Sequence, residues 1–144
     1  MHRKFKIGAL IALCSCGLSC GSGTSSQPQI VPYTGQIITI SDTTLRTGGV
    51  DTVRFGRLFE GEQAVKEVRL RNATTRPIVI SGYTRSCGCT TFEFERQPIA
   101  PNAESPIRLT FDSQGLRGWQ FKLIEVSIAN AAAPLKIYVD TEIE

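Results

Sequence analysis

Two cysteines in the middle of the chain, Cys87 and Cys89, have the spacing that redox or soft-metal chemistry uses. They stand in the segment Ser86-Cys87-Gly88-Cys89-Thr90-Thr91. Thiolates exchange disulfides and bind soft metals such as Cu(I). The chain has three further cysteines, all near its start: Cys14, Cys16 and Cys20. The sequence therefore predicts a disulfide or redox pair at Cys87 and Cys89, with a two-thiolate metal site as an alternative.

Three interpretations of this pair stay open at the level of sequence. Residues two apart in a strand have Cα atoms about 7 Å apart, the upper limit for a disulfide, so Gly88 would have to kink the chain. A bridge in so small a ring would be strained and easily reduced, which would make it a redox element. Alternatively, the thiolates bind Cu(I), or the pair is structural, since buried cysteines behave as small apolar residues.

The chain offers this pair few partners for catalysis. Its single histidine is His2 and its single methionine is Met1, and both precede an apolar run that we assign to an export signal. No Ser-His-Asp, Cys-His or histidine-containing metal site can then form in the mature chain. A Cys-x-x-Cys redox motif is also missing. We therefore expect a protein that is not an enzyme and that holds no cofactor.

The N-terminus has the order of features that export requires. Arg3, Lys4 and Lys6 precede the uncharged apolar run from residue 7 to 13, and small residues and cysteines follow. This order is typical of a secretory signal peptide, and the run is too short to span a membrane. The exit resembles a bacterial lipoprotein box. We expect the lipid, including palmitate, on Cys20, with Cys16 as the alternative.

Cleavage before Cys20 would divide the chain into a signal peptide at 1–19, a flexible tether at 20–34 and one domain at 35–144. The net charge of +3 is accounted for by the three basic residues of the signal. The mature chain is then formally neutral, which argues against a nucleic-acid partner because such proteins usually carry a basic surplus. Its length suits a single domain.

Beyond the tether, the pattern predicts short strands separated by turns. Apolar and polar residues alternate, as in Val68 and Leu70 or in Phe92 and Phe94, which indicates sheets with one buried face. The expected strands are 36–41, 52–59, 65–71, 78–83, 91–95, 107–111, 121–128 and 135–141. We predict an all-β immunoglobulin-like sandwich of about seven or eight strands with Greek-key connections and no capped helix. Residues 78–80 read as a central strand, and we expect Trp119 to pack at a sheet edge, as part of the core rather than as a binding platform.

The stretch from about residue 53 to 142 resembles a family of bacterial envelope proteins, the domain of unknown function 1573. The Ser-Cys-Gly-Cys-Thr signature at 86–90 is its most specific feature. The remaining matches are Phe55-Gly56, Glu60-Gly61, Val68-Arg69-Leu70-Arg71-Asn72, Pro77-Ile78-Val79-Ile80, Pro98-Ile99-Ala100-Pro101, Ile107-Arg108-Leu109-Thr110-Phe111-Asp112 and Gly118. The family usually has Pro-Gly-Glu where this chain has Pro101-Asn102-Ala103-Glu104. Asparagine tolerates left-handed backbone angles, so we expect the turn to survive.

The resemblance implies an immunoglobulin-like fold and a place in the envelope of a Gram-negative bacterium. From it and from the N-terminus we expect a lipid-anchored, non-enzymatic module, held to a membrane by its lipid and facing the periplasm or lying on the outer membrane. Such a module would bind another envelope protein through a sheet edge or a surface. The alternative is a thiol-redox or copper-handling accessory protein that uses Cys87 and Cys89.

Overall fold

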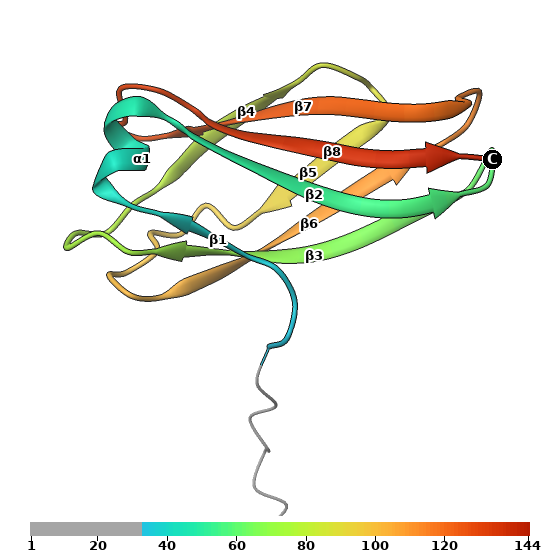
Figure 1. Ribbon diagram of the computed structural model, residues 1–144. Helices are drawn as coiled ribbons and strands as arrows, with labels where there is room; N and C mark the ends of the chain where they lie inside the picture. The colour runs from blue at the N-terminus through green and yellow to red at the C-terminus, as the bar shows by residue number, and fades with distance from the viewer. Residues whose placement is uncertain (1–32) are drawn as a thin grey trace, which may run out of the picture. The chain divides into compact units, whose positions relative to one another are not determined.

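The computed structural model describes residues 33–144, which form eight strands and one short helix (Figure 1). The expected signal peptide, the lipidation cysteines Cys16 and Cys20, and the tether up to residue 32 lie outside the described residues. The elements are β1 (Ile37–Ile40), α1 (Asp42–Thr47), β2 (Gly49–Leu58), β3 (Gln63–Asn72), β4 (Ile80–Arg85), β5 (Thr90–Phe94), β6 (Glu104–Asp112), β7 (Gly118–Ile128) and β8 (Leu135–Ile143).

The strands form two four-stranded sheets, with orders β1-β3-β6-β5 and β2-β8-β7-β4. Two pairs are parallel, β1 with β3 and β2 with β8, and the other pairs are antiparallel. The orders β3-β6-β5 and β8-β7-β4 match the B-E-D and G-F-C strands of an immunoglobulin domain, and β1 and β2, which run in opposite directions on either side of α1, each add an edge strand to one sheet (Figure 1). The predicted immunoglobulin-like sandwich is confirmed, and all eight expected strands are present.

The core lies between the inner faces of the two sheets. Val68 and Leu70 of β3 are buried there, as are Leu109 and Phe111 of β6. These are the positions that alternation assigned to the inner face. Because every second residue of a strand points inward, each strand contributes a row of aliphatic or aromatic side chains to one continuous cluster.

A short helix stands where no capped helix was expected. Ser41 caps α1, and its side chain accepts a hydrogen bond from the backbone N–H of Thr44, while the Thr44 hydroxyl accepts one from Ser41 N–H. Only Leu45 of the helix is buried, so the helix has too few turns to show an apolar period. It lies at the end of the sandwich opposite the C-terminus (Figure 1). Within residues 33–144, no helix is long and apolar enough to cross a membrane.

Two further expectations from sequence are wrong. Residues 78–80 do not form a central strand: Ile78 makes a single bridge to Ile99, and β4 begins at Ile80 as an edge strand. Trp119 is not in the core, because its side chain is 71% exposed on the outer face of its sheet. The turn at Asn102 is as expected, with a left-handed φ of 61°.

One buried polar residue joins the loops at the end of the sandwich. Asn72 is 0% exposed, and its side-chain amide donates to Arg76 O at 2.8 Å and to Ile99 O at 2.9 Å. Its side-chain oxygen accepts from the N–H and hydroxyl of Thr74 at 2.9 and 2.7 Å. Every polar atom of the side chain is thus satisfied, and the loop after β3 is fixed to the segment that precedes β6.

We predict that Asn72→Ala lowers the free energy of unfolding by about 2–4 kcal/mol, because it removes the buried hydrogen bonds to Arg76 O, Ile99 O and Thr74 and leaves the Thr74 N–H without its partner. Urea denaturation measures the change. Gln114→Ala, at an exposed turn, is the matched control and should stay within about 0.5 kcal/mol of the parent. A similar small effect for both variants would contradict this role for Asn72.

Candidate functional site

The Cys87–Cys89 pair forms a disulfide in the turn between β4 and β5. The two Cα atoms are 5.2 Å apart, inside the range that disulfides span and shorter than the spacing of an extended strand. Both cysteines are half-buried, and Cys89 packs against the core. The turn carries the chain from the edge strand of one sheet to the edge strand of the other. The redox and copper interpretations remain predictions.

Hydrogen bonds fix this turn to both sheets. Ser86 N–H donates to Leu123 O at 2.8 Å, and the Ser86 hydroxyl accepts from Leu123 N–H at 2.9 Å, which ties the turn to β7. On the other side, Asp112 N–H donates to Cys89 O at 2.8 Å, which ties it to β6. The Arg85 guanidinium also donates to Thr90 O, so a cation spans the start of the turn.

Gly88 is exposed at the tip of the turn and does not have a left-handed φ. A Cβ built at this position would meet no atom within 4 Å. The kink that brings the cysteines together therefore belongs to the turn as a whole and does not require glycine at residue 88.

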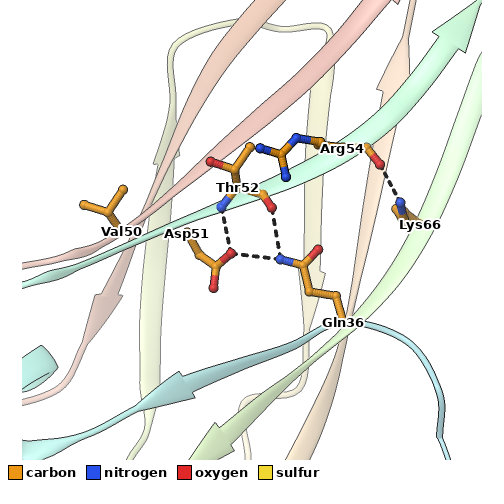
Figure 2. A pocket seen from close by; sticks show the side chains of 6 residues that line it. All are labelled: Gln36, Val50, Asp51, Thr52, Arg54 and Lys66. Atoms are coloured by element: carbon orange, nitrogen blue, oxygen red, sulfur yellow. Dashed lines mark hydrogen bonds between the residues drawn. The ribbon is translucent and has the colours of Figure 1, made fainter.

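The opposite side of the sandwich, where β1 and β2 are edge strands, is closed by side chains (Figure 2). Thr52 O accepts from the Gln36 side chain at 3.0 Å, and Thr52 N–H donates to the Asp51 carboxylate at 2.7 Å. Gln36 also donates to Asp51 at 2.8 Å, and the Lys66 ammonium donates to Arg54 O. These residues line a polar depression, and their side chains cap edge groups of β2. A further strand would have to break this network to pair with β2.

The side where β4 and β5 are edge strands is open. Cys89 O pairs with β6, and because alternate residues of a strand point their backbone groups the same way, Thr91 and Glu93 also pair with β6. The backbone groups of Phe92 and Phe94 then point to the free edge. Thr90 O accepts from Arg85, but the structure gives the N–H and C=O of Phe92 and Phe94 no hydrogen-bond partner within residues 33–144.

Aromatic side chains line this open side. The rings of Tyr83 on β4 and Phe92 on β5 have centroids 5.3 Å apart, and Phe94 meets the Tyr83 ring edge-on at 6.3 Å. Tyr83 and Phe94 are only half-buried, whereas Phe92 is in the core. An apolar side chain arriving along the edge would find these half-covered rings to pack against.

The comparisons with known proteins agree with the fold. A family model described as "Protein of unknown function (DUF1573)" matches residues 47–143. The chain belongs to this family. The predicted resemblance is thus confirmed, and the Cys87–Cys89 turn and β5 lie within the matched range. No curated protein matches the chain.

Solved structures share the fold at low sequence identity. A protein of unknown function from Porphyromonas gingivalis W83 is 22% identical, with a TM-score of 0.56 over 63% of this chain and 43% of that one. The secreted serine protease VesC from Vibrio cholerae is 7% identical, with a TM-score of 0.50 over 62% of this chain. The matched part spans only 21% of VesC, so this chain corresponds to a fraction of either neighbour.

We predict that the Cys87→Ser plus Cys89→Ser variant stays folded and loses about 1.5 kcal/mol of unfolding free energy. A disulfide that closes so short a loop removes little entropy from the unfolded chain, and Ser86, Cys89 O and Arg85 still hold the turn. Urea denaturation tests this, with the reduced parent as the matched control. Failure of the variant to fold would show that the bridge is essential to the crossover.

Proposed function

We propose that this protein is a lipid-anchored, non-enzymatic module of the bacterial cell envelope that binds an extended segment of another protein along β5. The observation that carries the proposal is the contrast between the two sides of the sandwich. The edge groups of β2 at Thr52 and Arg54 are capped by Gln36, Asp51 and Lys66, whereas those of Phe92 and Phe94 have no partner within residues 33–144, and of these two Phe94 is only half-buried.

Strand addition would use these groups directly. An extended segment beside β5 would exchange main-chain hydrogen bonds with Phe94, and this supplies affinity without regard to sequence. Alternate side chains of the segment would meet the half-buried rings of Tyr83 and Phe94, and this supplies selectivity for apolar residues. A partner with an exposed or disordered apolar segment fits such a site.

The N-terminus supports the envelope location. A lipid on Cys20, or on Cys16, would hold the chain at the membrane, and the Gly-, Ser- and Gln-rich residues that follow have the composition of a flexible linker. The domain would then reach partners near the membrane surface.

Photo-crosslinking in the native bacterium tests the binding edge. Benzoylphenylalanine replaces Glu93, exposed on β5, or Val50, exposed on the capped strand β2. We expect a discrete protein adduct from position 93 and none from position 50. The intact mass of the isolated protein reports in the same preparation whether Cys20 or Cys16 carries lipid.

A matched pair of substitutions separates the backbone from the side chain. Phe94→Pro removes both the ring and the N–H on the free edge, whereas Phe94→Ala removes only the ring. Proline is tolerated at this position because its missing N–H would face away from the sheet. The adduct at position 93 should weaken with alanine and disappear with proline, while both variants keep their circular dichroism. Adducts of equal strength from positions 50 and 93 would refute a binding role specific to β5.

A further inference from the structure

Trp119 is the single tryptophan of the chain, and it stands on the outer face of the sheet formed by β2, β8, β7 and β4. Its neighbour on the same face, Phe121, is 48% exposed. The position is in register with Glu142 of β8, so the ring lies over paired strands and away from both sheet edges. This aromatic surface is separate from the β5 edge and is not explained by strand addition.

The exposed indole is held in a defined position. Trp119 Nε1 donates to Asp140 Oδ1 at 2.6 Å, and its ring centroid lies 5.8 Å from that of Phe121. Phe121 stacks on Tyr138 at 4.6 Å with an interplanar angle of 10°. Phe121 and Tyr138 therefore cover each other's faces and support the indole, which remains the most exposed ring of the three. A rigid ring of this kind loses little entropy when a ligand packs on it.

A hollow of about 230 Å³ lies beside Trp119. The hollow lies at the bulge between Arg54 and Gly56 in β2. Gly56 has a φ of 81° there, and a Cβ at this position would meet no atom within 4 Å. Bulges commonly redirect side chains next to binding sites. The hollow thus places polar groups next to the face of an aromatic ring.

Ion pairs surround this hollow. Arg54 Nε lies 3.5 Å from Asp140 Oδ2, and Arg57 lies between two carboxylates, 3.4 Å from Glu142 Oε2 and 3.0 Å from Glu144 Oε1. Both arginine side chains are more than 70% exposed, so these ion pairs are weakly held and can exchange partners. The guanidinium groups and carboxylates supply donors and acceptors with no surplus of positive charge, a match for vicinal hydroxyls and a poor match for a phosphate.

We propose that the Trp119 surface, made of Trp119, Arg54, Arg57, Asp140 and Glu142, binds a neutral oligosaccharide. One sugar ring packs its C–H face on the indole, and its hydroxyls hydrogen-bond the arginines and carboxylates of the hollow. Asp140 accepts a hydrogen bond from the indole itself and also pairs with Arg54, so polar groups stand at the edge of the ring. Here charged side chains adjoin the ring directly, which favours a polyhydroxylated ligand.

The lone tryptophan makes this site directly observable. The emission of Trp119 in the full chain is followed during titration with maltohexaose, cellohexaose, xylohexaose, mannohexaose and laminarihexaose. We expect a saturable change with at least one of these neutral sugars. Calorimetry with that sugar should show binding weakened about tenfold or more by Trp119→Ala, and less by Trp119→Phe, which keeps a ring.

Val65→Ala, which removes an exposed apolar group on the other sheet, is the matched control and should bind as the parent does. Circular dichroism confirms that each variant folds. The proposal is overturned if none of the five sugars binds, or if binding is unchanged in both Trp119 variants. It is also overturned if sedimentation shows that Trp119 mediates association with a second copy of the chain in place of sugar binding.

Discussion

The unpaired backbone groups of edge strands are the constraint on which this structure depends. Two four-stranded sheets have four edge strands between them, and in this chain they fall into two pairs, each joined by one connection. The helix α1 joins β1 to β2, and the disulfide-bearing turn joins β4 to β5. The two sides then differ in what happens to the free N–H and C=O groups, which in other proteins are covered or blocked to prevent unwanted pairing.

On the β1–β2 side, the cover comes from the other sheet. Gln36 lies just before β1 and Lys66 lies on β3, yet both reach carbonyl groups of β2, and Asp51 completes the network through its own neighbour Thr52 (Figure 2). On the β4–β5 side, Arg85 covers only Thr90 O. The Cys87–Cys89 turn is thus located at the start of β5, an edge strand whose groups at Phe92 and Phe94 have no hydrogen-bond partner within residues 33–144.

Much of the fold could be predicted from the sequence because its strands alternate cleanly. Pairs such as Val68 and Leu70 fixed both the strand and its buried face. The helix α1 escaped notice because only Leu45 is buried and Thr44 stands where a capping box usually has Glu or Gln. Residues 78–80 were predicted to form a central strand because they are apolar. Ile78 is instead buried where it forms an isolated bridge with Ile99, and burial there gives the same apolar sequence pattern as burial inside a sheet.

The candidate sites were harder to predict. The sequence drew attention to Cys87 and Cys89, but it could not choose between a bridge and free thiols, since that depends on a kink in the turn. Trp119 was placed in the core because large aromatic residues usually are, and nothing local shows that β7 turns it outward. The open edge of β5 has no sequence signal at all, because it depends on which distant side chains fail to reach it.

Amide hydrogen exchange in the free protein, measured by nuclear magnetic resonance, tests the difference between the two edges most directly. The account predicts slow exchange for the Thr52 amide, which donates to Asp51, and fast exchange for the amide of Phe94, which is only half-buried. Thr91 and Glu93, which point to β6, are the internal controls and should be protected. Protection of Phe94 equal to that of Thr91 and Glu93 would contradict the open edge.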